Sequence, residues 1–217
     1  MPDGRLIIGT RRYSSWSLRG WLLVRLAGLD VTEQVIPLSG TGAGGTPAVT
    51  AATPAGLVPY LEHLGAQVWD SLAIAEYCAE AKPELWPVDR VKRAAARSIS
   101  AEMHAGFGAL RKAMPMNLGR DRQTAASADV TADIARIEAI WRAARTGSQF
   151  LYQGHFGAAD AMYAPVVARF LSYRPELAAD TRDYCHAVRQ HPLVAEWYAA
   201  AAEEPTSWRL AHYEGVA

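Results

Sequence analysis

Hydrophobic positions in the first part of the chain come in short runs separated by turn-forming residues. Residues 6–8 form an apolar run that is typical of a buried strand, and residues 31–37 predict a second strand. Between them, residues 18–27 are apolar at most positions and are followed by Gly28, so we predict a helix that ends at this glycine. Residues 39–53 are rich in Gly, Thr and Ala and predict a loop with at most a weak helix.

Two more strands and a helix follow this loop. Residues 57–64 and 67–69 are strand-like, and the intervening Gly65-Ala66 pair is a hairpin signal. A capped helix is then predicted over residues 72–82, and Pro83 ends it. The order β-α-β, then β-β-α, predicts a small mixed sheet with helices packed against it.

The pattern changes after Pro87, where strand signals almost vanish. Residues 90–114 predict one long Ala-rich helix, and residues 133–145 carry apolar side chains at the spacing of an amphipathic helix. Further helices are predicted over residues 160–172, 176–190 and 193–202. The second part of the chain is therefore predicted to be all-α.

This change of pattern predicts two domains. Residues 1–82 form the mixed α/β domain, and residues 90–217 form the all-helical domain. Residues 83–89 contain two prolines, so we interpret them as a stiff linker.

Composition narrows the classes of function. Lys plus Arg and Asp plus Glu number 22 each, so no net positive charge draws the chain to nucleic acid or to a membrane surface. The longest apolar runs are too short to span a bilayer, and the N-terminal residues show no signal-peptide pattern. The two cysteines, Cys78 and Cys185, form no C-x-x-C pair, which predicts a reduced, cytoplasmic protein. No Cys/His cluster has zinc spacing, so no metal is expected.

A serine cluster stands between the first strand and the first helix, in residues 13–19 (YSSWSLR). A helix N-terminus presents unpaired N–H groups and the positive end of a dipole, which stabilise an anion such as a thiolate. Lowering a thiol pKa from roughly 8.5–9 to near 7 needs about 2–3 kcal/mol. One charge-assisted hydrogen bond from a serine, roughly 1.5–3 kcal/mol, together with the dipole is of the right size. The alternative is that these serines are ordinary helix caps.

Two other dipeptides admit a structural or a binding interpretation. Pro59 forfeits a ladder hydrogen bond, so residues 57–61 are either an edge strand or contain a cis Val58-Pro59 bond. The cis form would turn the Val58 backbone outward, toward an extended peptide-like ligand. Asp70 and Ser71 cap a helix, and the same geometry suits an amino-acid end group. The Ser71 hydroxyl and nearby N–H groups would take its carboxylate, and Asp70 would take its ammonium.

These motifs, in this order, resemble the cytosolic glutathione transferase superfamily over essentially the whole chain. The likeness is strongest to serine-type bacterial members related to the zeta class. Residues 14–19 match the family's S-S-x-S-x-R motif, residues 58–61 match V-P-x-L, and residues 70–71 match [ED]-S. Asp160, within residues 159–161, resembles the acidic residue that satisfies backbone N–H groups at the start of a core helix. The resemblance implies a thioredoxin-like N-terminal domain (βαβ-ββα) followed by an all-helical domain.

The resemblance also implies roles for individual residues. Ser14 or Ser15 would hydrogen-bond the glutathione thiolate. Val58, held by Pro59, would pair with the cysteinyl backbone. The remaining glutathione contacts would be Trp16 beside the sulfur, and Asp70 and Ser71 at the γ-glutamyl end. Glutathione would be a co-substrate, and the protein would be a cytoplasmic homodimer without metal, nucleic acid or membrane partners.

The second substrate would lie between the domains, against the long helix that begins at Arg90. Met103, His104, Phe107, Met114 and Met116 are the candidates for a pocket that takes a small apolar electrophile, because methionines make adaptable apolar surfaces. Residues 39–53 contain no Lys or Arg, which relatives often use to hold the glycyl carboxylate of glutathione. The alternative is therefore a non-catalytic ligand-binding or interaction protein of the same fold.

Overall fold

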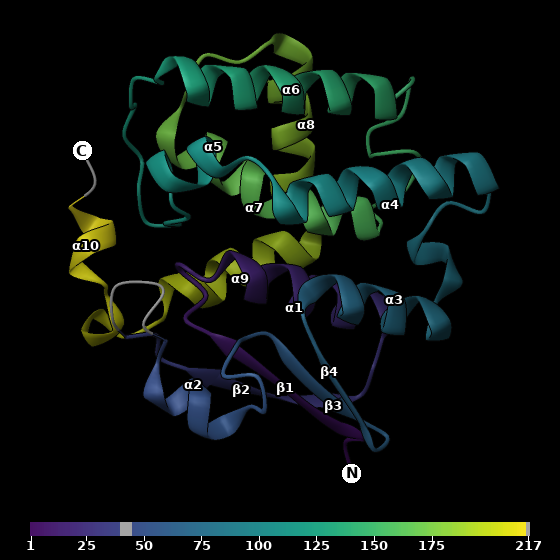
Figure 1. Cartoon of the computed structure of the whole chain (residues 1–217), viewed down its shortest axis with the longest axis vertical. Coiled ribbons are helices and arrows are strands. Elements are labelled where there is room, and N and C mark those ends of the chain that lie inside the picture. The colour runs from purple at the N-terminus through teal and green to yellow at the C-terminus, as the bar shows by residue number, and fades with distance from the viewer. Residues whose placement is uncertain (40–44, 216–217) are drawn as a thin grey trace.

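The computed structural model describes residues 1–39 and 45–215. Figure 1 shows a small sheet on one side and a bundle of helices on the other, with two helices of the sheet domain between them. This arrangement confirms the predicted fold class, a thioredoxin-like domain followed by an all-helical domain. Residues 40–44 of the predicted loop lie outside the described residues.

The sheet has the order β2-β1-β3-β4. Its strands are β1 (Gly4–Gly9), β2 (Val31–Ile36), β3 (Tyr60–His63) and β4 (Ala66–Trp69). The β1 strand is parallel to β2 and antiparallel to β3, and β3 is antiparallel to β4. The predicted third strand was too long, since β3 begins only at Tyr60. Pro59 has no N–H group to donate to the ladder, which explains this late start.

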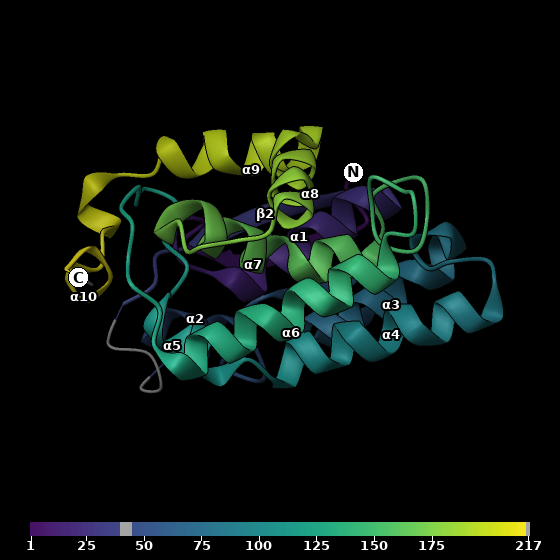
Figure 2. The same ribbon diagram turned by 90° about the horizontal axis from the view of Figure 1, so that it is seen from above.

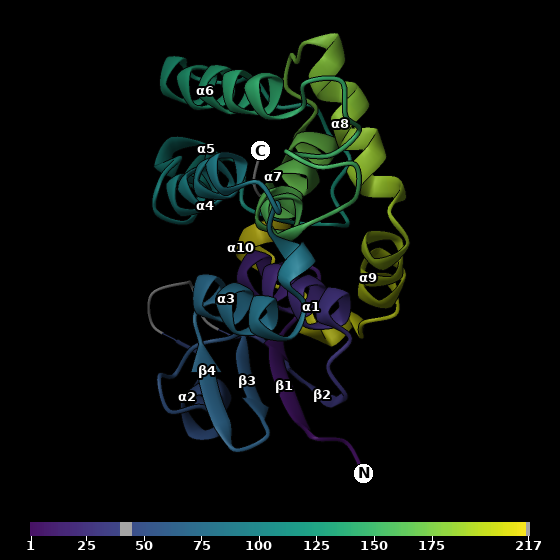
Figure 3. The same cartoon turned by 90° about the vertical axis from the view of Figure 1, so that its right-hand side faces the viewer.

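Side chains of β1 alternate between two apolar layers, as the period of a strand requires. Leu6 and Ile8 belong to the main core, which they share with α1 (Ser15–Ala27) and α3 (Ser71–Ala81). Ile7 faces the other side of the sheet and packs with Val49 of α2 (Pro47–Ala52). The expected weak helix within residues 39–53 is thus α2, and its apolar contact fastens it to the sheet. Figure 3 shows α1 and α3 together above the strands.

The helical part surrounds one buried helix. Its elements are α4 (Arg90–Ala105), α5 (Gly108–Ala113), α6 (Ala128–Ala144), α7 (Ala158–Tyr173), α8 (Ala179–Gln190), α9 (Pro192–Ala202) and α10 (Ala211–Glu214), with 3-10 turns at Pro83–Leu85 and Thr206–Trp208. Nearly every residue of α7 is buried. It runs through the middle of the bundle, between α6 and the sheet-side helix α1 (Figure 2). The Arg19 side chain of α1 donates a hydrogen bond to the Met162 carbonyl of α7, 2.9 Å away, and joins the two parts.

The prediction of one helix over residues 90–114 was wrong, because the chain breaks between α4 and α5. Gly106 is extended and Phe107 adopts a left-handed conformation with φ 56°. Glycine is a poor helix former, and the left-handed residue redirects the chain. The Arg111 side chain then donates to the carbonyls of His104 and Gly106 at the end of α4, at 3.2 and 3.4 Å.

Asp160 performs the capping role that the resemblance implies. Its side chain is fully buried and accepts hydrogen bonds from the N–H groups of Leu151 and Gly157, at 3.0 and 2.9 Å. The Tyr184 hydroxyl donates a third bond of 2.9 Å. All described strands precede Pro83, but the division at residues 83–89 into two domains stays a prediction.

Candidate functional site

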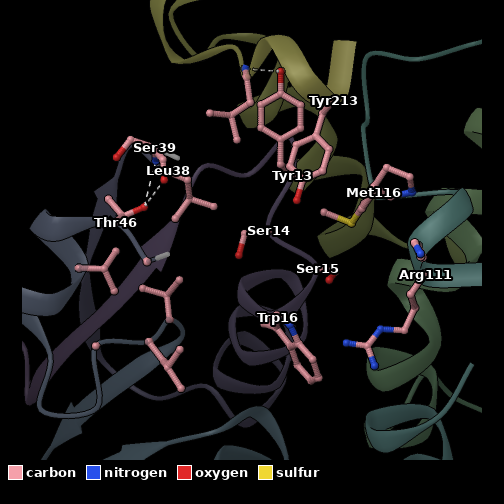
Figure 4. Close-up of a pocket in the computed structure, with 18 of the residues that line it drawn as sticks. Tyr13, Ser14, Ser15, Trp16, Leu38, Ser39, Thr46, Arg111, Met116 and Tyr213 are labelled. Carbon is pink, nitrogen blue, oxygen red and sulfur yellow. Dashed lines mark hydrogen bonds between the residues drawn. The ribbon is translucent and has the colours of Figure 1, made fainter. Parts of the chain in front are cut away.

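A cavity of about 540 Å³ opens where the N-terminus of α1 meets α5. Figure 4 shows Ser14, Ser15 and Trp16 in its centre, with Arg111 and Met116 on the helical side. It is lined by residues 13–16, 38–39 and 56–58, by Gly45, Thr46 and Val49, by Gly108, Arg111, Lys112, Pro115 and Met116, and by Arg169, Leu210 and Tyr213. Segments from five distant parts of the chain therefore share this space.

Ser14 is the N-cap of α1, and its side chain is almost fully buried. Its oxygen accepts the Ser17 N–H at 3.3 Å, and the two hydroxyl oxygens lie 2.7 Å apart. Ser17 Oγ in turn accepts the N–H of Gly9 at 2.9 Å. The capping interpretation of Ser14 is therefore confirmed, and it places the hydroxyl at the positive end of the helix dipole.

Ser15 is the first residue of α1, and its side chain is half-buried at the cavity. Its hydroxyl has no hydrogen bond to any residue in 1–39 or 45–215. Both serines predicted from the sequence thus line the same space, and they differ in that only Ser14 is already engaged.

Two guanidinium groups lie over the Trp16 ring. The Arg19 carbon Cζ is 4.7 Å from its centroid, and that of Arg111 is 4.9 Å away. The His104 ring meets the indole edge-on at 4.8 Å. Cation–π attraction of this kind holds the indole in place at the floor of the cavity.

The Val58-Pro59 peptide bond is cis, and Val58 lines the cavity just before β3 begins. Pro59 packs tightly against α1, because a Cβ on Gly20 would lie only 2.6 Å from its ring. The sequence motif and the start of α1 are therefore neighbours in space.

Asp70 and Ser71 begin α3, outside the lining of this cavity. Asp70 has φ 73° and accepts the Leu72 N–H at 2.8 Å, while its other oxygen is 3.1 Å from His104 Nε2. Burial lowers the pKa of His104, against the pull of Asp70. Ser71 is buried, and its hydroxyl has no hydrogen-bond partner within the described part of the chain.

Of the five predicted electrophile-pocket residues, the structure brings only Met116 to the described lining of the cavity. Met103, Phe107 and Met114 belong to the buried core. Because the chain breaks at Gly106, the segment that follows turns different side chains toward the cavity than one continuous helix would. Its contributions are Gly108, Arg111, Lys112, Pro115 and Met116.

Sequence reasoning missed the arginines of the cavity. Arg111 and Lys112 are adjacent basic residues in a predicted surface helix, which is a pattern typical of a solvated face. Arg169 does carry a signal, because it interrupts the otherwise apolar stretch of residues 161–171. A charged residue within so apolar a run indicates a buried charge with a functional role.

The two thiols are far from nucleophilic. Burial raises the pKa of Cys78 and of Cys185 to about 12. In residues 1–39 and 45–215, no group of three His, Cys, Asp or Glu side chains is arranged to hold a metal ion. Among the helices described, none has the length and apolar character needed to cross a membrane.

Comparison with known proteins gives two sequence matches. The profile of the glutathione S-transferase N-terminal domain matches residues 13–81, and that of the glutathione S-transferase C-terminal domain matches residues 120–200. No curated protein matches the whole sequence significantly.

Solved structures share the fold at low sequence identity. A glutathione transferase homologue from Burkholderia, with bound glutathione, has TM-score 0.69 and 18% identity over 93% of this chain and 99% of its own. A theta-class glutathione S-transferase from Xanthomonas axonopodis pv. citri, also with glutathione bound, has TM-score 0.65 and 20% identity, covering 94% and 99% of the two chains. A tau-class enzyme from mango has TM-score 0.67 and 17% identity, covering 93% and 96%.

Proposed function

The chain belongs to the glutathione S-transferase superfamily, and on that premise we propose that it is a glutathione transferase. It ionises the glutathione thiol with a serine hydroxyl and joins the sulfur to an electrophile with an apolar body. One observation carries this proposal: the hydroxyls of Ser14 and Ser15, the N-terminus of α1 and the Val58 residue before β3 face one cavity.

Ser14 is the serine that we propose for the sulfur. In the structure Ser14 Oγ donates to Ser17 Oγ, 2.7 Å away, and Ser17 Oγ also accepts the Gly9 N–H. When glutathione binds, Ser17 would donate to Ser14 Oγ instead. A hydroxyl rotates to suit its partners, and Ser14 can then direct its proton to a thiolate. That thiolate would also lie at the positive end of the α1 dipole. Ionising the nucleophile and holding both reactants together are the two sources of the rate gain.

The remaining motifs supply the rest of the glutathione site. Val58 would pair its backbone with the cysteinyl residue. The buried, unpartnered Ser71 hydroxyl would donate to the γ-glutamyl carboxylate, and Asp70 would take the ammonium. For the latter contact, Asp70 would exchange its His104 partner for the ligand.

The same proposal extends to the class of the protein, its location and assembly, and the roles of its domains. Residues 14–19 support a serine-type member related to the zeta class. We propose a cytoplasmic homodimer, in which residues 1–82 bind glutathione and residues 90–217 bind the electrophile, with residues 83–89 as the linker.

The test is the ultraviolet difference absorbance of bound glutathione between pH 5 and pH 9, with calorimetric titration for affinity. In the wild type we expect a thiolate band that titrates well below the free thiol. Ser14→Ala should return the bound thiol toward its ordinary pKa and lower kcat/KM about 10- to 100-fold, the equivalent of one charge-assisted hydrogen bond. Ser14→Thr is the matched control, because it keeps both the hydroxyl and the helix cap.

Other outcomes would redirect the proposal. Loss of the thiolate band in Ser15→Ala alone would assign the role to Ser15. Binding of glutathione with an unshifted thiol would favour the non-catalytic carrier, which the absence of Lys and Arg from residues 39–53 also favours. No binding at millimolar glutathione would exclude both the transferase and the glutathione carrier.

A further inference from the structure

We infer, resting on the proposed transferase function, that the electrophile carries an anionic group, a carboxylate, which Arg111 and Arg169 hold on the helical wall of the cavity. Both arginines line the cavity, neither forms an ion pair with a described carboxylate, and apolar side chains line the cavity beside them.

Arg169 is a buried cation at the cavity wall. It lies on α7, is 5% exposed, and lines the cavity. Its Nη1 donates to the Pro165 carbonyl at 2.9 Å, but its Nε has no partner within the described part of the chain. Burial, and then the charge of Arg111, lower its pKa to about 10, so it remains protonated at neutral pH. An unpaired buried charge is costly, and a cavity-facing site for an anion accounts for it.

Arg111 reaches the same space from α5. Its guanidinium is half-buried over the Trp16 ring, and burial lowers its pKa. Arg19 also lies over that ring, and its pKa falls to about 9 through burial, with Arg169 and Arg111 adding repulsion. The three guanidinium groups therefore repel one another, and those of Arg19 and Arg111 lie over one indole.

No described carboxylate pairs with the two arginines of the cavity wall, and of the three arginines only Arg19 interacts electrostatically with an acidic residue, Asp70. Among the described residues, no carboxylate forms an ion pair with Arg19, Arg111 or Arg169. The described cavity lining contains three basic side chains, Lys112 being the third, and no Asp or Glu. This contrasts with the whole chain, where 22 basic and 22 acidic residues balance. A planar guanidinium is well matched to a carboxylate, which it can bind through two parallel hydrogen bonds.

The neighbouring surface suits an apolar body attached to that anion. Met116 and Tyr213 stand beside Arg111 at the cavity (Figure 4), and Pro115 and Leu210 also line it. Ser14 and Ser15 lie across the cavity from Arg111. An electrophile anchored by its carboxylate at the arginines would thus present its reacting carbon to the sulfur.

The test compares 4-chloro-3,5-dinitrobenzoate with the uncharged 4-chloro-3,5-dinitrobenzamide. In both reactions the thiolate electron pair forms the carbon–sulfur bond, the carbon–chlorine bond breaks, and chloride leaves with its electron pair. The buried cysteines will not compete for the reagent, since their pKa values are about 12. We expect wild-type kcat/KM to favour the benzoate over the benzamide, after correction for the uncatalysed rates.

Arg111→Gln should lower the ratio of kcat/KM for the benzoate to kcat/KM for the benzamide about 10- to 100-fold. Arg111→Lys should lie between wild type and Arg111→Gln, because it keeps the charge but loses the planar fork. Arg142→Gln is the matched control: it removes the same charge at an exposed site paired with Asp180, outside the cavity, and should change neither value. Glutathione affinity and melting temperature verify that each variant is folded.

Equal losses for both substrates in Arg111→Gln, or a shifted thiol pKa of bound glutathione in that variant, would overturn the inference. The cluster would then serve the thiolate. Turnover of both substrates without preference for the benzoate would overturn the inference and leave the transferase intact. Failure to bind glutathione would remove the proposed function and, with it, the inference.

Discussion

The position of Ser71 and its environment have different origins. Its position at the start of α3 follows from a local capping pattern, which also includes Asp70. Its burial does not follow from that pattern, and neither does the lack of a partner for its hydroxyl in the described structure. A buried hydroxyl without a partner costs free energy, so we interpret it as a donor held ready for a ligand.

Ser71→Ala should therefore separate binding from stability. Because the hydroxyl forms no described hydrogen bond, the melting temperature should stay the same or rise slightly. The Kd for glutathione should rise about 10- to 100-fold, the equivalent of one hydrogen bond to a carboxylate. Ser98→Ala serves as control, since Ser98 is exposed on α4 and bonds only to the Ala94 carbonyl. An unchanged Kd together with a lower melting temperature would assign Ser71 a structural role.

At the scale of elements, the side chains with a proposed function or a capping role are positioned by the ends of helices more than by their interiors. The N-terminus of α1 places Ser14, and the break between α4 and α5 brings Arg111 to the cavity. The start of α7 depends on Asp160, because Gly157 at the N-cap offers no side chain of its own. The carboxylate substitutes for that missing cap and also fastens the preceding loop through Leu151.

The buried carboxyl group of Asp160, at the start of α7, is expected to make the free energy of unfolding depend on pH. Burial raises its pKa to about 6, against the hydrogen bonds that it accepts, whereas the ordinary value is 3.8. A carboxyl with a raised folded-state pKa contributes its stability below the unfolded pKa and loses it as pH rises through the folded pKa. The loss between pH 4 and pH 7 is about 3 kcal/mol.

The measurement is the free energy of unfolding of wild type minus that of Asp160→Asn, across this pH range. The difference isolates Asp160, because asparagine does not titrate and the other carboxyl groups are shared. It should fall as pH rises from 4 to 7. A difference that grows with pH would show that the three donors outweigh burial and keep the carboxylate ionised.

At the scale of the whole molecule, α10 and the segment that precedes α1 meet at the cavity. Glu214 of α10 accepts hydrogen bonds from the Tyr13 hydroxyl at 2.5 Å, from Arg12 Nε at 3.0 Å and from Asn117 Nδ2 at 3.3 Å. Burial opposes ionisation of Glu214, but the bonds from Tyr13 and Arg12 outweigh it and lower its pKa. This cluster holds Tyr213 against the cavity.

Glu214→Gln should weaken the hydrogen bonds that attach α10 to the cavity wall, without disturbing the glutathione site. We expect a loss of about 1 kcal/mol in stability, because the carboxylate is partly exposed. The KM for the electrophile should rise several-fold, because Tyr213 is less well held, and the Kd for glutathione should not change. Hydrogen exchange of residues 209–215 should become faster than in the Glu203→Gln control, an exposed neighbour. Unchanged exchange would show that α10 is held by packing alone.

Much of this protein was predictable from local signals. Short apolar runs bounded by turn-forming residues predicted the four strands, and capping residues indicated the helix starts near the serine cluster and at Asp70. These features depend on interactions within a few residues of chain, so a linear pattern contains them. The resemblance added the cis bond before Pro59 and the buried role of Asp160, both of which the structure confirms.

The cavity itself was decided by the tertiary structure. Met103, Phe107 and Met114 look like pocket residues in the sequence but lie in the core, whereas Arg111 and Arg169 line the cavity. The left-handed conformation of Phe107 determines which side chains of α5 face the serines, which lie far away in the chain. The sequence alone therefore determined the secondary-structure elements and the place of the serines at the start of α1. The tertiary structure determined which side chains surround the serines and that these side chains are basic, because those contacts join residues far apart in the chain.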